Sequence, residues 1–181
     1  MKYRKPSWVA GAAVVFSLAG SCGQSPSALA VEPAAPKGYL LKKEPKDAKE
    51  VKAVRAKAKN GDDVVVVGRI GGRKNPWVKG AAAFSIVDTS LKSCDEIPGD
   101  TCPYPWDYCC EADLGKATVF VTFVDDAGKI VKQDARKLLK VKELQTVVIE
   151  GKVKRDKADN VIILASKLYA RTNESSNDRR R

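Results

Sequence analysis

Four cysteines lie close together in the chain and carry its most distinctive chemistry. They are Cys94, Cys102, Cys109 and Cys110, in the spacing C-x7-C-x6-C-C. Between Cys94 and Asp113 there are six acidic residues and no Lys or Arg. Thiols at this density either pair as disulfides or bind a soft metal ion. The segment is therefore the first candidate for a disulfide-bonded loop or a functional site.

Three interpretations of these cysteines remain open. An exported chain favours two disulfides, in which Cys109 and Cys110 each pair with an earlier cysteine because a bond between neighbours is strained. Alternatively, the four thiolates hold a soft metal ion, although the chain lacks the paired C-x2-C arms of a zinc ribbon. The third is an exchangeable vicinal disulfide, which the acidic surroundings disfavour because they destabilise thiolates. We prefer the disulfides and expect no cofactor, with a metal ion at the cysteine cluster as the alternative.

Aromatic and acidic residues next to the last cysteines form a candidate binding surface. This set, with one tryptophan that follows the first predicted strand, is Trp77, Tyr104, Trp106, Asp107, Tyr108 and Glu111. The aromatic rings either pack under the loop and cover the cysteines, or they face a partner protein or a sugar. The sequence alone does not separate these two roles.

The residue types that are missing exclude several kinds of catalytic site. The chain has 181 residues and no histidine, which removes His-dependent nucleophiles, His-ligated zinc and His-ligated haem. The acidic residues of the loop offer a glycosidase-like pair of carboxylates, but a flexible loop is a poor scaffold for such a pair. We therefore expect that the chain is not an enzyme.

The positive charge lies mostly outside the predicted domain. The net charge is +11, yet residues 60–170 hold 17 Lys and Arg against 16 Asp and Glu. A nucleic-acid-binding domain needs a basic patch on its folded surface. We therefore do not expect nucleic acid as a partner.

The N-terminus has the pattern of an export signal. A basic start precedes an apolar run over 8–19, which is shorter than the about 20 residues of a transmembrane helix. The sequence Leu-Ala-Gly-Ser-Cys that ends at Cys22 resembles the lipobox of bacterial lipoproteins. The resemblance implies a signal peptide over 1–21, a lipid on Cys22 and a membrane as partner through that lipid. Ordinary cleavage after Ala30 is the alternative, and both predict export, with the domain facing the periplasm or the cell exterior.

Two flanking segments have the composition of irregular chain. Residues 22–45 are rich in Ser, Ala, Gly and Pro without a period, which predicts a flexible tether. Residues 171–181 contain four Arg and few apolar residues, which predicts a disordered basic tail.

A helix is predicted over residues 46–60, leading into the domain. Asp47 and Glu50 have the spacing of a capping box at its start. The apolar face that would pack on the domain consists of Val51, Val54 and Ala58.

The body of the chain, over residues 61–170, is predicted to be mainly β. Five segments rich in β-branched residues lie at 62–72, 81–88, 117–124, 145–154 and 161–169. A short helix or loop over 134–144 separates the third strand from the fourth, and a cysteine-rich insertion over 91–116 separates the second from the third. Together they predict a small five-stranded barrel.

The strand pattern resembles an OB-fold, with Gly68 and Gly151 falling in the middle of the first and fourth strands. The resemblance implies a ligand face on strands two and three and the adjacent loops, often for oligonucleotides or oligosaccharides. Those strands offer Phe84, Phe120 and Phe123 and almost no positive charge, so we expect these rings to be core residues. The fold alone does not imply nucleic-acid binding.

The cysteine-rich insertion resembles one that recurs in uncharacterised exported bacterial lipoproteins, and that resemblance supplies no activity. The preferred hypothesis is a membrane-anchored, extracytoplasmic, non-catalytic binding module with a protein partner. The first alternative is a metal-handling protein that uses the four cysteines of the loop. The second alternative is an OB-fold binder of nucleic acid or oligosaccharide.

Overall fold

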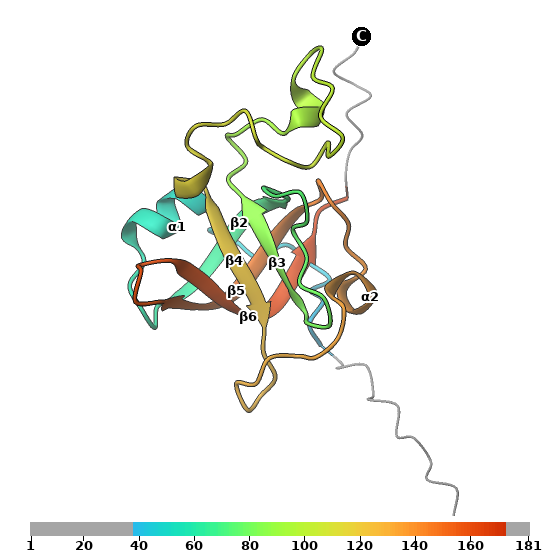
Figure 1. The fold of residues 1–181 in the computed structure, drawn as a ribbon. Coiled ribbons are helices and arrows are strands. Elements are labelled where there is room, and N and C mark those ends of the chain that lie inside the picture. The colour runs from blue at the N-terminus through green and yellow to red at the C-terminus, as the bar shows by residue number, and fades with distance from the viewer. Residues whose placement is uncertain (1–37, 173–181) are drawn as a thin grey trace, which may run out of the picture. The chain divides into compact units, whose positions relative to one another are not determined.

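The computed structural model describes residues 38–172. Five strands close into a barrel (Figure 1). They are β2 (Asp63–Ile70), β3 (Ala83–Val87), β4 (Thr118–Phe123), β5 (Thr146–Arg155) and β6 (Val161–Ala170). The order is β2–β3–β4–β6–β5, and β5 returns to pair with β2. Strands β4 and β6 are parallel and the other barrel pairs are antiparallel, so the predicted mainly β, OB-like barrel is confirmed.

The barrel closes around one hydrophobic core, to which every strand contributes alternate residues. Phe84 and Ile86 of β3 and Phe123 of β4 are fully buried, as expected for period-two strands with one face inside. Phe120 is half-buried and lies on the other face of β4. The expected core position is therefore confirmed for Phe84 and Phe123 but not for Phe120.

Gly151 lies at a register shift between β5 and β6, where the strands pack too closely for a side chain. A Cβ atom there would lie 2.4 Å from the carbonyl oxygen of Leu164. The predicted need for glycine at this point of the fourth strand thus has a steric cause.

The segment before the barrel differs from the predicted helix over 46–60. Residues Lys49–Glu50 form a two-residue strand, β1, that pairs parallel with β2, and helix α1 covers only Val51–Lys57. Asp47 has a positive φ of 59° and lies outside the helix, so it does not act as its cap. The predicted apolar face is confirmed, because Val51 and Val54 are buried in the barrel core.

The predicted tether over 22–45 is wrong for residues 38–45. The backbone of Tyr39 and Leu41 hydrogen-bonds to Leu168 of β6, and the Tyr39 hydroxyl donates to the carbonyl of Val124. Glu44 forms an ion pair with Arg171 at 2.6 Å, so Arg171 belongs to the barrel edge and not to a disordered tail. The tether pattern missed these contacts because the partners, Val124, Leu168 and Arg171, lie far away in sequence.

The short helix between the third and fourth barrel strands is present as α2 (Ala135–Leu139), inside the predicted segment 134–144. Asp134 caps it by accepting hydrogen bonds from the amides of Arg136 and Lys137. No helix in residues 38–172 is long and apolar enough to cross a membrane. The predicted signal peptide, Cys22 and residues 173–181 lie outside the described residues.

Candidate functional site: the cysteine loop

The cysteine-rich insertion forms a long loop, called here the cysteine loop (residues 91–116), above one end of the barrel (Figure 1). It leaves the end of β3 and returns to the start of β4. It contains two short 3-10 helices, Cys94–Glu96 and Leu114–Lys116, and no strand. Loops of this length without strands are usually functional.

A buried tyrosine attaches the cysteine loop to the barrel. Tyr108 is fully buried in a second hydrophobic cluster with Val87, Leu91 and Ala117, separate from the barrel core. Gly71, just after β2, allows this close approach, since a Cβ there would lie 3.1 Å from the Tyr108 ring. Tyr108 therefore holds the loop down and is not part of an exposed binding surface, contrary to the sequence-based assignment.

A half-buried ion pair makes a second attachment. Arg69 of β2 donates a hydrogen bond to the carboxylate of Glu96, which also accepts bonds from the amide and hydroxyl of Ser93. Burial raises the pKa of Glu96, but Arg69 and Ser93 more than offset this and hold it below its usual value. Burial also raises the pKa of Tyr108 to about 12, against the opposing effect of the nearby Arg69 charge. This attachment thus combines an ionised carboxylate with a neutral phenol.

Three of the four cysteines converge at the centre of the loop. The Sγ atoms of Cys94, Cys102 and Cys109 all lie within 4.8 Å of one another, and those of Cys94 and Cys109 are 3.6 Å apart. Cys110 lies to one side, with its Sγ 4.0 Å from that of Cys109. The structure thus groups the four cysteines singled out in the sequence as three and one.

The predicted pair of disulfides is not present in this structure, where all four cysteines are free. A disulfide needs sulfur atoms about 2.05 Å apart. Here three sulfur atoms lie within 4.8 Å of one another, whereas two disulfides require the four sulfur atoms to form two separate pairs. The pairing argument from the sequence could not detect this, because it assumed that adjacent Cys109 and Cys110 would reach different partners.

The local environment favours the protonated form of the Cys94 and Cys109 thiols. Burial raises the pKa of Cys94 to about 12, and the neighbouring Cys102 and Asp100 add to the effect. For Cys109, the hydrogen bond with Cys94 lowers the pKa, but Cys110 and the other neighbours raise it more. Cys94 and Cys109 are therefore poor sources of thiolate nucleophiles on their own.

The aromatic residues of the candidate surface that remain accessible to solvent are Tyr104 and Trp106, called here the aromatic pair. Both are half-buried, and their ring centroids lie 6.1 Å apart. The Trp106 indole donates to the carbonyl of Lys74 at 3.1 Å, while its own carbonyl accepts from the Gly72 amide at 3.1 Å. The ammonium group of Lys74 lies 4.9 Å from the centre of the Tyr104 ring. The pair is thus bonded to the chain that follows β2.

The two acidic members of the candidate surface have structural roles. Asp107 accepts a hydrogen bond from the Tyr108 amide through its carboxylate and another from the Cys94 amide through its carbonyl. The Glu111 carboxylate accepts from the amide of Lys92. Both residues are half-buried, so each presents part of its carboxylate to solvent while it shapes the loop.

Trp77 does not belong to this surface. It is 8% exposed, packs against Phe84 at 5.4 Å between ring centroids, and its indole donates to Glu143. The sequence suggested a surface position because the residue follows Asn75-Pro76 in a predicted loop. In the structure, this segment pairs with β3, which places the ring inside the barrel.

Three residues with important roles were not singled out in the sequence. Arg69 has no local signal, because its partner Glu96 lies 27 positions away. Asp88 accepts a hydrogen bond from the Lys52 amide at 2.7 Å and so caps α1 from the end of β3. Asp100 holds the Cys102 amide with one carboxylate oxygen, while its other oxygen is buried without a hydrogen-bond partner among the described residues.

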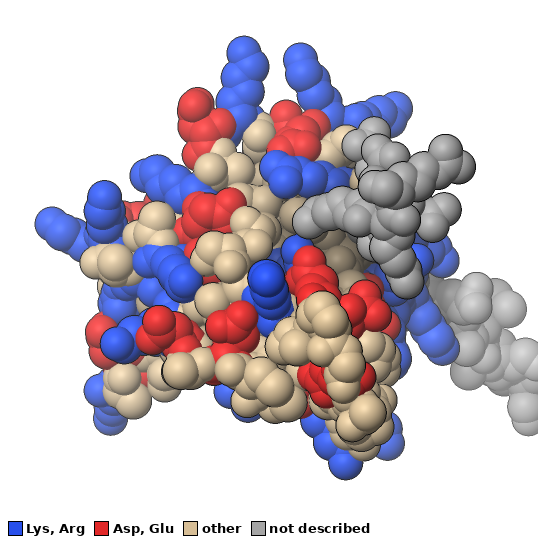
Figure 2. All heavy atoms as spheres, turned by 90° about the horizontal axis from the view of Figure 1, so that it is seen from above, with Lys and Arg blue, Asp and Glu red and all other residues tan. Residues whose placement is uncertain are grey.

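Charge is segregated between the loop and the rest of the domain. Six of the 16 acidic residues of 60–170 lie between Cys94 and Asp113, and none of the 17 Lys and Arg does. Figure 2 looks down on the loop and shows acidic side chains on the protrusion with Lys and Arg around it. The near-neutral balance of the domain is therefore the sum of an acidic loop and a basic remainder.

No protein-family model matches the chain, and no curated protein does. Among solved structures, the hypothetical protein ygiW from E. coli is 15% identical over 68% of this chain and 89% of that one, with a TM-score of 0.39. An OBody, AM1L10, bound to hen egg-white lysozyme is 16% identical over 72% and 98%, with a TM-score of 0.40. The S. pombe Stn1-Ten1 complex is 14% identical over 64% and 61%, with a TM-score of 0.33. At these values the fold assignment depends on the strand order, and no functional argument follows from the likeness.

Proposed function

We propose that this chain is a non-catalytic binding module that contacts a partner protein through Tyr104 and Trp106. We also propose that the chain is exported and is anchored to a bacterial membrane by a lipid on Cys22. The barrel supplies the scaffold, and OB-like barrels generally serve as binding modules. The anchor is inferred from the N-terminal sequence pattern.

The observation that carries this proposal is the attachment of Trp106 at two points. Its ring bonds to the Lys74 carbonyl and its backbone to the Gly72 amide, so the half-buried indole is held in one position before any partner arrives. Aromatic side chains that are ordered in advance lose little entropy on binding and commonly dominate the affinity of an interface. Acidic residues around the pair favour a partner with a basic surface.

A protein partner fits the described surface better than a nucleic acid does. All five residues of β3 are buried, and two of the three phenylalanines on β3 and β4 are in the core. The OB face on these strands therefore offers no row of exposed rings for stacked bases. The acidic loop would also repel a phosphate backbone.

The anchor is tested by fractionating cells that make the full chain. We expect the wild-type chain in the membrane fraction and Cys22→Ser in the soluble exported fraction. A Cys22→Ser chain that stays in the membrane would contradict lipid anchoring.

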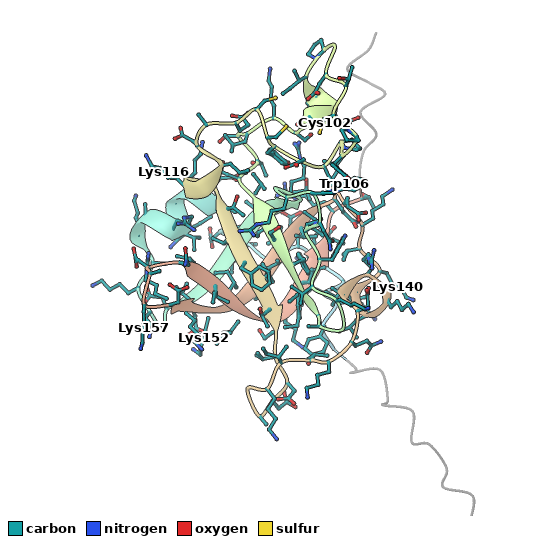
Figure 3. The ribbon with its side chains drawn as sticks, viewed as in Figure 1. Cys102, Trp106, Lys116, Lys140, Lys152 and Lys157 are labelled. Atoms are coloured by element: carbon teal, nitrogen blue, oxygen red, sulfur yellow. The ribbon has the colours of Figure 1, made fainter. Side chains whose placement is uncertain are left out.

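The contact surface is tested in the same cells by placing a photo-crosslinking amino acid at position 104. A discrete crosslinked protein should form, and it should disappear when Trp106→Ala is added. The matched control is the same amino acid at Lys157, at the other end of the barrel, where no such product is expected (Figure 3). Crosslinks of equal yield from both positions, or insensitivity to Trp106→Ala, would overturn the proposal.

A further inference from the structure

We propose that Cys94, Cys102 and Cys109 form a binding site for a single thiophilic metal ion, zinc(II) or copper(I), with Cys110 outside the required ligand set. The site lies inside the cysteine loop, above the barrel (Figure 3). It goes beyond the proposed binding function and does not depend on it.

The spacing of the sulfur atoms fits a shared ion. Metal–sulfur bonds of about 2.3 Å place the thiolates of a tetrahedral or trigonal site about 3.8 to 4.0 Å apart. The three Sγ atoms lie within 4.8 Å of one another, with Cys94 and Cys109 at 3.6 Å. Small side-chain movements therefore suffice to bring all three sulfurs to one ion.

The backbone holds the three cysteines in place without help from an ion. The Cys94 amide donates a hydrogen bond to the Asp107 carbonyl. This bond joins the part of the loop that contains Cys94 to the part that contains Cys109. The Cys102 amide donates to Asp100 at 2.8 Å. Cys109 directly follows the buried Tyr108, whose ring is packed against the barrel. The segments that carry Cys94 and Cys109 are thus attached to other parts of the structure, and a local turn with Asp100 shapes the segment around Cys102.

The charges around the cluster favour a cation. Six acidic residues and no Lys or Arg lie between Cys94 and Asp113, so the chain around the thiolates is strongly acidic. The nearest basic residue in the sequence is Lys92, two positions before Cys94. One oxygen of Asp100 is buried without a hydrogen-bond partner among residues 38–172. A bound cation supplies the missing positive charge, and the Asp100 carboxylate can orient a ligand from outside the first coordination shell.

The choice of ion follows from the ligand type. Thiolate sulfur selects zinc and copper(I) over the hard ions that prefer oxygen. With three protein ligands, copper(I) is held in a trigonal site, while zinc keeps a fourth position for water or another ligand. Cys109 is exposed, so solvent can reach the cluster.

The test uses the full chain, purified reduced and without oxygen, with zinc(II) and copper(I) as separate probes in competition with chelating dyes. We expect one ion per chain, with protons released as the thiols ionise. Cys94→Ser and Cys109→Ser should each weaken binding by more than about 100-fold, and Asp100→Asn by about 10-fold. Cobalt(II) substitution gives a second readout, because its thiolate charge-transfer bands report how many sulfurs bind.

Cys110→Ser is the matched control, since it makes the same chemical change one residue away and outside the group of three. It should weaken binding by less than about 10-fold. A loss as large as that of Cys94→Ser would overturn the assignment of ligands. Failure of the reduced chain to bind either ion, or an exported chain four hydrogens lighter than its reduced form and free of metal, would overturn the site. Circular dichroism of each variant separates loss of the site from loss of the barrel.

Discussion

The barrel and the cysteine loop are stabilised in different ways. Each barrel strand pairs with two neighbours, and 22 buried residues form one continuous hydrophobic core. The cysteine loop has no strand, and the cluster that attaches it contains four buried residues, of which Leu91 and Tyr108 belong to the loop. A region with so few apolar contacts opens at a lower free-energy cost than the barrel. The loop can therefore change state, by binding an ion or a partner, while the barrel stays folded.

The largest effect is expected from a change that adds one methyl group to the barrel. In Gly151→Ala, the new Cβ would lie 2.4 Å from the Leu164 carbonyl oxygen and 2.9 Å from the Ala165 Cα. Because both neighbours are backbone atoms, we expect the free energy of unfolding of the whole domain to fall by about 3 kcal/mol. Urea denaturation followed by circular dichroism measures this change.

The control for Gly151→Ala is Gly115→Ala in the cysteine loop, where an added Cβ meets nothing within 4 Å. It should leave the urea midpoint unchanged. Equal midpoints for the two variants would show that the barrel tolerates strain at β5 and would weaken the contrast between the regions.

A smaller and local effect is expected from Gly71→Ala, at the junction of the two regions. The added Cβ would lie 2.5 Å from the Trp106 carbonyl oxygen and 3.1 Å from the Tyr108 ring. The loop should lift from the barrel, and the cost of opening it should fall by about 2 kcal/mol, with a smaller change in global stability. Hydrogen exchange at the Cys94 and Tyr108 amides measures loop opening. An equal loss of protection in β5 would contradict the independence of the loop.

The smallest effect is expected from Asp88→Asn, which weakens the cap that β3 provides to α1. Burial raises the pKa of Asp88, but hydrogen bonds from Ser90 and the Lys52 amide more than offset it and hold the pKa below its usual value. The variant should lose about 1 kcal/mol at neutral pH. Because the folded pKa is lowered, this contribution is present above the unfolded value of about 3.9 and is lost as the pH falls through the folded value.

Denaturation midpoints of the wild type and Asp88→Asn at neutral and acidic pH check this prediction. The two proteins should differ at neutral pH and converge in acid. Asp113→Asn, at an exposed position of the loop, is the control and should match the wild type at both pH values. A difference that persists in acid would assign the effect to packing and not to the charge of Asp88.

The sequence by itself determined the class and the strands of this fold. Runs such as Val64–Val67 and the alternation around Phe84 and Ile86 are local patterns, and strands β2 to β6 formed within two residues of the predicted bounds. It also identified the cysteine loop, because an insertion with four cysteines and no Lys or Arg from Cys94 to Asp113 stands out from any barrel strand.

Only the tertiary structure decided which residues of the candidate surface are exposed and how the cysteines are grouped. Tyr108 is buried against Gly71, which lies 37 positions earlier in the sequence, and Trp77 is buried because its segment folds back to place the ring on Phe84. Cys94 meets Cys109 because a backbone bond to Asp107 joins two arms of one loop. Contacts of this kind depend on the conformation of loops, whose sequences have no hydrophobic periodicity. The pattern of side chains predicts only the helices and strands that the loops connect.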